Sequence, residues 1–213
     1  MEIKTENVLY LIAGPNGAGK TTLVERVFGK NPGVKFVNAD NIAREHHFQP
    51  VSSDTGRVLF SELDDAFSMH ASFIYETTLS GKFDSKIIKR AKDSGYSIEF
   101  FYVILSSVEQ NLARVHARFQ NGGHDVPENV VLRRHKKSLF NFDSVYKQSD
   151  HWQIYNNAGA ECKLFATGAY DIVNVIDEGL YDTFIKTKQN VIAAYVADIA
   201  RRRGVHIDKG GYC

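Results

Sequence analysis

The sequence predicts a three-layer α/β fold, in which helices cover both faces of a mostly parallel central sheet. Short apolar runs typical of strands alternate along the 213 residues with segments whose apolar residues recur at helical spacing. A glycine-rich loop stands between the first such strand and the first helix. Since hydrophobic residues make up 43% of the chain and charged residues 24%, the composition is that of an ordinary globular domain. We therefore expect one domain over residues 1–213.

The first elements surround the glycine loop. Residues 8–13 form a short apolar run, which favours a buried strand, and residues 21–28 have the composition of a helix. Residues 34–39 read as a second strand that ends at Asp40. Because ligands of such sheets bind at the carboxyl ends of the strands, the ends of these strands become candidate site positions.

The middle of the chain continues the alternation. Apolar residues within 57–70 recur at helical spacing, and residues 72–75 form a third strand that ends at Glu76. Residues 83–94 are predicted to form a helix, with Gly95 as its stop. Strand, helix and strand in this order imply right-handed crossovers between parallel strands.

The last part of the chain begins with its richest apolar strand, at 96–105, which we expect at the centre of the sheet. A helix over 108–120 ends at Asn-Gly-Gly, and Pro127 opens the next helix, since proline is favoured in the first helical turn. The remaining predicted elements are strands at 152–155 and 172–176 and a long closing helix at 181–203.

The loop after the first strand matches the phosphate-binding motif G-x-x-x-x-G-K-[ST] at every fixed position. Glycines let successive backbone N–H groups turn toward an anion, and the following helix N-terminus favours negative charge. Lys20 can reach the β- and γ-phosphates, and the Thr21 hydroxyl can ligate Mg²⁺. We therefore predict that the chain binds ATP with Mg²⁺ through Gly14, Asn16, Gly17, Ala18, Gly19, Lys20, Thr21 and Thr22, with Thr21 as the metal ligand.

The composition indicates which classes of partner and which cellular location to expect for this chain. The net charge of +1 gives no general signature of nucleic-acid binding, and the longest apolar stretches are too short to cross a bilayer. The N-terminus lacks the pattern of a signal peptide. Two cysteines make neither a disulfide framework nor a metal cluster. We expect a cytoplasmic protein without membrane or nucleic-acid partners.

Polar residues at two strand ends are candidates for the second substrate. Asp40 is placed to accept the proton of an attacking hydroxyl, although Asp40 or Asn41 could simply cap a helix beginning at Ile42. Glu76 could contact a substrate or lie in a solvated loop, and both interpretations stay open. Thr78 and Ser80 would add hydroxyl groups for a polar substrate.

Arginines flank the turn from 120 to 127, an arrangement that predicts a mobile lid near residues 112–140. Guanidinium groups suit this position because their planar fork matches phosphate oxygens. The alternative is an ordinary solvated basic helix face. His124, in the lid turn, could bind phosphate or only cap. We assign Arg118 and Arg134 to catalysis, together with Lys20 and Asp40, and assign Arg114 and Arg133, together with Asp40, Glu76, Thr78 and Ser80, to substrate binding.

Two other classes of nucleotide-binding protein fit less well. The loop spelling Pro-Asn-Gly-Ala-Gly-Lys-Thr-Thr resembles that of ABC-transporter ATPases, but the chain has no LSGGQ signature and no later apolar strand that ends in Asp-Glu. An N-K-x-D motif for guanine recognition is also missing, which argues against a switch GTPase.

The whole pattern resembles the zeta-toxin family of P-loop kinases. The resembling segments are 14–22, 38–43, 76–81, Arg114-Val115 with Arg118, 122–128, Arg133-Arg134 and 152–157. The resemblance implies a P-loop NTPase/kinase fold with a helical lid and ATP-dependent phosphorylation of a small-molecule hydroxyl, for which the sugar hydroxyl of UDP-N-acetylglucosamine is a candidate. It implies that Lys20 and Thr21 hold phosphates and Mg²⁺, that Asp40 is the base, that Glu76 and Thr78 contact the substrate, and that the lid arginines stabilise the transition state. It also implies a protein antitoxin as a partner.

The chain departs from that family pattern at two places. Ser80 stands where the toxins have an arginine, and Asn156-Asn157-Ala158 replaces the usual Asp-Asn-Ser. Alternative functions therefore stay open: a nucleoside or polynucleotide 5′-kinase, a toxin module that acts chiefly through its antitoxin, or a nucleotide switch with slow hydrolysis.

Overall fold

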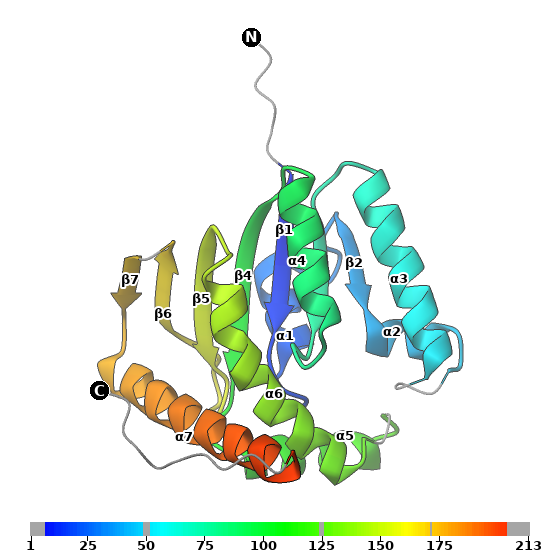
Figure 1. Cartoon of the computed structure of the whole chain (residues 1–213). Helices are drawn as coiled ribbons and strands as arrows, with labels where there is room; N and C mark the ends of the chain where they lie inside the picture. The colour runs from blue at the N-terminus through cyan, green and yellow to red at the C-terminus, as the bar shows by residue number, and fades with distance from the viewer. Residues whose placement is uncertain (1–6, 49–51, 124–125, 171, 204–213) are drawn as a thin grey trace.

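The computed structural model describes residues 7–48, 52–123, 126–170 and 172–203, and these form one seven-stranded sheet with seven helices (Figure 1). The strand order is β2-β3-β1-β4-β5-β6-β7. The first five strands are parallel, whereas β6 and β7 are antiparallel to their neighbours. The strands are β1 (Val8–Ala13), β2 (Lys35–Asn38), β3 (Phe73–Thr77), β4 (Ser97–Ile104), β5 (His151–Asn156), β6 (Lys163–Ala169) and β7 (Ile172–Val175).

Helices pack on both faces of this sheet, which confirms the predicted three layers. In Figure 1, α4 and α6 lie in front of the sheet and α1 lies behind it. Two separate apolar clusters correspond to the two faces. One contains Leu11, Phe100 and Trp152, and the other contains Ile12 and Leu23. The helices are α1 (Lys20–Phe28), α2 (Ala39–Glu45), α3 (Ser53–Ser68), α4 (Phe83–Asp93), α5 (Val108–Gln120), α6 (Glu128–Tyr146) and α7 (Glu178–Arg202).

The alternating pattern of elements was predicted correctly up to β5, and α5 has the predicted limits. The sequence prediction missed β6, because its residues Lys-Leu-Phe-Ala-Thr-Gly-Ala show little alternation and end in small residues. The chain reverses at β6, which runs antiparallel to β5, and reverses again at β7, which pairs antiparallel to β6 at the sheet edge, so these strands do not continue the crossovers. Among the described helices, none is both long and apolar enough to span a bilayer.

One predicted boundary near the site is wrong. The second strand ends at Asn38, and α2 begins at Ala39 rather than at Ile42. The cap is Asn38, whose Oδ1 accepts hydrogen bonds from the backbone N–H groups of Asp40 at 2.7 Å and Asn41 at 3.1 Å. Asp40 therefore lies in the first turn of α2, and its carboxylate is not used as the cap.

Candidate functional site

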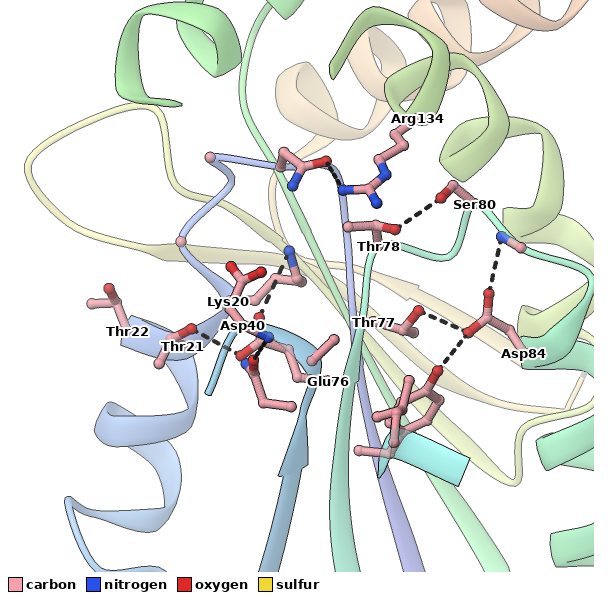
Figure 2. Close-up of a pocket in the computed structure, with 18 of the residues that line it drawn as sticks. Lys20, Thr21, Thr22, Asp40, Glu76, Thr77, Thr78, Ser80, Asp84 and Arg134 are labelled. Carbon is pink, nitrogen blue, oxygen red and sulfur yellow. Dashed lines mark hydrogen bonds and ion pairs between the residues drawn. The ribbon is translucent and has the colours of Figure 1, made fainter. Parts of the chain in front are cut away.

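A cavity of about 500 Å³ opens at the carboxyl ends of β1, β2 and β3, where the strand-end rule predicts a ligand. The phosphate loop lies on one side of it and the end of β3 with the start of α4 on the other (Figure 2). Helices α5 and α6 add side chains from above the loop. The lining residues are Asn16, Gly17, Gly19–Thr22, Asn38–Asp40, Leu59, Tyr75–Thr78, Ser80, Gly81, Phe83, Asp84, Arg114, Arg118, Arg134 and Asn157.

The loop has the backbone geometry that the motif predicts. Gly14 and Gly19 have φ values of 147° and 91°, which side chains rarely tolerate. A Cβ at Gly14 would lie 2.1 Å from the carbonyl oxygen of Val103 in β4, and one at Gly19 would lie 2.1 Å from Nδ2 of Asn157. The loop is therefore held closely between β4 and the residues after β5. Gly14 and the buried Ala18 shape the loop without lining the cavity.

Lys20 and Thr21 both contact Glu76, the next-to-last residue of β3. Nζ of Lys20 lies 3.8 Å from Oε1 of Glu76 and donates to the carbonyl oxygen of Pro15 at 3.3 Å. The Thr21 hydroxyl donates to Oε2 of Glu76 at 2.9 Å. Glu76 is buried, which contradicts the solvated-loop interpretation. Burial raises the pKa of Glu76 and lowers that of Lys20, while the attraction between the two charges opposes both shifts.

These contacts test whether the site fits Mg²⁺ and a nucleotide. Mg²⁺ prefers hard oxygen ligands and is held by few protein groups together with phosphates and water. The Thr21 hydroxyl and the Glu76 carboxylate supply such oxygens beside the loop. Within the described ranges, no cluster of three or more His, Cys, Asp or Glu side chains offers a cage for a metal. The residues present fit a metal that arrives with the phosphates.

Asp40 faces the lid across the mouth of the cavity. Nη1 of Arg118, in α5, lies 3.1 Å from Oδ2 of Asp40. Both side chains are partly exposed, at 37% for Asp40 and 42% for Arg118. The register between β2 and β3 places Asn38 opposite Glu76, which brings the start of α2 and its Asp40 to the same end of the sheet as Glu76.

Of the other three lid arginines, Arg134 and Arg114 line the cavity and Arg133 does not. Arg134, in α6, donates from Nη1 to Oδ1 of Asn16 in the loop at 3.4 Å, and burial lowers its pKa while Asp40 opposes that shift. Arg114, in α5, donates from Nη2 to the carbonyl oxygen of Asn157 at 2.6 Å, on the loop side of the cavity. The structure does not bring Arg133 to the lining. His124 lies outside the described residues.

Two asparagines in contact with the loop were not among the predicted site residues. Nδ2 of Asn111, in α5, donates to the carbonyl oxygen of Asn16 at 2.7 Å. Nδ2 of Asn157 donates to the carbonyl oxygen of Ala18 at 2.8 Å. Neither had a local signal, because a single asparagine in a helix or after a strand fits many roles; only the position of Asn157 within the resembling segment 152–157 pointed toward it.

The side of the cavity away from the loop carries hydroxyl groups on a constrained turn, and we call it the β3 arm: Leu59, Tyr75, Thr77, Thr78, Ser80, Gly81, Phe83 and Asp84. The hydroxyl oxygens of Thr78 and Ser80 lie 2.8 Å apart. Asp84, which was not predicted, accepts hydrogen bonds on Oδ1 from Thr77 at 2.7 Å and from Tyr75 at 3.1 Å (Figure 2). Burial raises the pKa of Asp84.

Comparisons with known proteins show which family and which relatives the sequence is similar to. The family model described as zeta toxin matches residues 2–168. An uncharacterized protein of Haemophilus influenzae is 33% identical over 133 residues, which are 61% of this chain and 94% of that protein.

Solved structures show a similar fold. A structure of AvrRxo1-ORF1:-ORF2 with ATP matches with a TM-score of 0.69 and 18% identity, over 85% of this chain and 64% of that one. The chain thus spans slightly less than two thirds of that relative. The PezAT toxin–antitoxin system of Streptococcus pneumoniae matches with a TM-score of 0.52 and 13% identity, over 90% of this chain and 87% of that one. The Pnkp1/Rnl/Hen1 RNA repair complex matches with a TM-score of 0.54 and 16% identity, over 65% of this chain and 46% of that one.

Proposed function

The chain belongs to the zeta toxin family, and we propose that it is an ATP-dependent kinase that transfers the γ-phosphoryl group to a hydroxyl of a small molecule. One observation carries this proposal. A phosphate loop with Lys20 and Thr21 shares a single cavity with the Asp40 carboxylate and with a separate arm rich in hydroxyl groups. Hydrolysis alone would not require that arm, whereas transfer to a second substrate does.

On the donor side, the loop N–H groups and Lys20 would bind the phosphates of ATP. Thr21 and Glu76 would hold Mg²⁺, which when bound neutralises charge on the phosphates. The Glu76 carboxylate, whose Oε1 lies 3.8 Å from Nζ of Lys20, would keep the Lys20 ammonium directed at the loop. Because both are buried, they lose little to solvent screening.

On the acceptor side, Asp40 would orient the attacking hydroxyl and accept its proton. It is paired with Arg118 in the structure, and the phosphates of ATP would compete for that guanidinium. Arg118, Arg114 and Arg134 line the same cavity and would stabilise the charge of the transferring group. A substrate contact by Arg133 would require the lid to move, since its side chain is exposed.

The family resemblance makes UDP-N-acetylglucosamine a candidate acceptor, and the alternative is a nucleoside or polynucleotide 5′ end. The fold shared with an RNA repair complex is compatible with the alternative. One structural neighbour is the PezAT toxin–antitoxin system, which supports a further proposal that a protein antitoxin binds this chain.

Incubation with ATP, Mg²⁺ and a panel of nucleotide sugars, nucleosides and oligonucleotides tests the proposal by mass shift of the acceptor. Asp40→Asn should lower turnover by about 10²–10⁴-fold and leave ATP affinity within about threefold of the wild type. Asp93→Asn, an exposed carboxylate at the end of α4, is the control and should change neither. Labelled phosphate found only in water, or an unchanged turnover for Asp40→Asn, would contradict the assignment.

A further inference from the structure

We infer that the acceptor is an uncharged, hydroxyl-rich ring compound rather than a phosphorylated one. The inference rests on the proposed phosphoryl transfer and narrows it, since it disfavours nucleotide sugars and oligonucleotides as acceptors. It follows from where the charges of the cavity lie and from the chemistry of the β3 arm.

Three of the positive charges that line the cavity in the described part of the chain lie on the loop side, and the fourth, Arg118, lies at Asp40. Among the described residues, four cationic side chains line it, and each has a partner near the loop or at Asp40. Lys20 contacts Pro15 and Glu76, Arg134 contacts Asn16, Arg114 contacts Asn157, and Arg118 contacts Asp40.

These cations match the donor alone. Mg²⁺-bound ATP carries about two net negative charges at neutral pH. Three carboxylates, Asp40, Glu76 and Asp84, accompany the four cations in the described lining, so the formal net charge is one positive. Bound Mg²⁺–ATP therefore neutralises the positive charge of the cavity, and no net positive charge remains to attract a phosphate of the acceptor.

The β3 arm, as far as it is described, has no charged group that would attract an anion. Its lining holds no cation among the described residues, and its one carboxylate, Asp84, would repel a phosphate. Lys82, the cap residue of α4, is exposed and does not line the cavity. The hydroxyl groups of Thr78 and Ser80 suit hydroxyl partners. Leu59 and Phe83 form an apolar wall, and the Phe83 ring packs on Phe60 with ring centroids 4.0 Å apart, which suits the flat face of a base or sugar ring.

The arm is also held rigidly, so it cannot readily rearrange to expose a cation. Leu79 is fully buried with a φ of 55°, and its carbonyl oxygen accepts a hydrogen bond from Nδ2 of Asn141 at 2.9 Å. Asp84 fixes both ends of the same turn, through the Thr77 hydroxyl and through the Gly81 N–H at 3.3 Å. Thr78 and Ser80 are therefore presented by a turn with three anchors.

The test compares matched pairs of acceptors that differ by phosphate. The pairs are N-acetylglucosamine with N-acetylglucosamine 1-phosphate, uridine with UMP, and adenosine with AMP. UDP-N-acetylglucosamine is titrated beside them as the charged candidate named above. Their affinities are measured by titration calorimetry with Mg²⁺ and a non-hydrolysable ATP analogue already bound, and transfer is then measured with ATP. We expect at least one uncharged compound to bind at least tenfold more tightly than its charged mate, which is about 1.4 kcal/mol. The three pairs also separate a sugar from a nucleoside as the preferred ring.

A designed charge change in the arm gives an independent measurement. Ser80→Arg should raise the relative affinity for the charged mates by about tenfold, whereas Ser80→Gln, of similar length without charge, should not. Lys82→Ala should leave the preference unchanged. Tighter binding of UDP-N-acetylglucosamine or of a nucleotide to the wild type overturns the inference and leaves the kinase proposal intact. Binding of uncharged compounds with no transfer from ATP supports the inference about the arm and contradicts the kinase proposal, and failure of every uncharged compound to bind overturns the inference.

Discussion

Gly19→Ala tests whether the loop between β1 and α1 is the nucleotide site. Gly19 has a φ of 91°, and an added Cβ would lie 2.1 Å from Nδ2 of Asn157. An alanine in this left-handed conformation costs about 1–2 kcal/mol. Displacement of Asn157 removes its hydrogen bond to the carbonyl oxygen of Ala18, about 1 kcal/mol more. The free energy of unfolding should therefore fall by about 2–3 kcal/mol, and ATP affinity should fall by about 10–100-fold because the loop N–H groups are displaced.

Gly95→Ala is the matched control. Gly95, after α4, has a φ of 75°, but an added Cβ would meet nothing within 4 Å. This variant should lose about 1–2 kcal/mol of stability, from the backbone conformation alone, and keep the ATP affinity of the wild type.

Urea denaturation gives the stabilities, and titration calorimetry with Mg²⁺ and ATP gives the affinities. In a double-mutant cycle, Asn157→Ala should offset part of the Gly19→Ala penalty, so that the two effects fall short of additivity by about 1 kcal/mol. Wild-type ATP affinity in Gly19→Ala, or strict additivity in the cycle, would refute the reasoning.

Two further predictions concern stability. His135 is buried between the lid helices, where burial lowers its pKa to about 4 although Glu109 opposes the shift and Lys136 adds to it. Because the unfolded chain takes up the proton near the ordinary pKa of 6.5, the free energy of unfolding should fall as the pH drops from about 6.5 toward 4. His135→Leu should remove about 2–3 kcal/mol of the difference in this free energy between pH 7 and pH 4.5, as measured by urea denaturation at both pH values. The control His116→Leu, at an exposed position, should leave this difference unchanged. Gly168→Ala should cost more than about 3 kcal/mol because its Cβ would lie 2.0 Å from the carbonyl oxygen of Ile172 and 2.2 Å from the Trp152 ring. Gly159→Ala should be nearly neutral, since its Cβ would meet only the carbonyl oxygen of Glu161, at 4.0 Å. Equal midpoints for the two variants in thermal unfolding would contradict this packing.

The parts of the fold that were predicted correctly are those with a local signal. β1 is a continuous apolar run, and α5 is bounded by a polar start and an Asn-Gly-Gly stop, so both follow from neighbouring residues alone. The strand β6 has no such signal, because it is held by pairing with β5 and by packing beneath Phe184 and other residues distant in sequence. Because β6 was not predicted, the antiparallel pairing of β5 with β6 and of β6 with β7 was not predicted either.

The site residues that were predicted correctly are likewise those with a local signal in the sequence. Lys20 and Thr21 were found because the motif states a local chemical requirement, the binding of phosphate by a turn and a helix N-terminus. Glu76 was placed at the right strand end, but the burial that pairs it with Lys20 depends on the register of β1 against β3. Asn111 and Asp84 contact the site from a helix far along the chain and from behind a turn, and nothing in their neighbours distinguishes them from ordinary polar residues. Asn157 was marked only by its place in the resembling segment 152–157.

The sequence by itself therefore determined the layers of the fold, the phosphate loop and the family, because each is written in short-range pattern and spacing. Only the tertiary structure decided which arginines reach the cavity, how Asp40 is paired, and that the β3 arm is without positive charge among the described residues. The physical reason is that charge pairing and burial are properties of distances in space, and these are fixed by strand register and helix packing rather than by position in the chain.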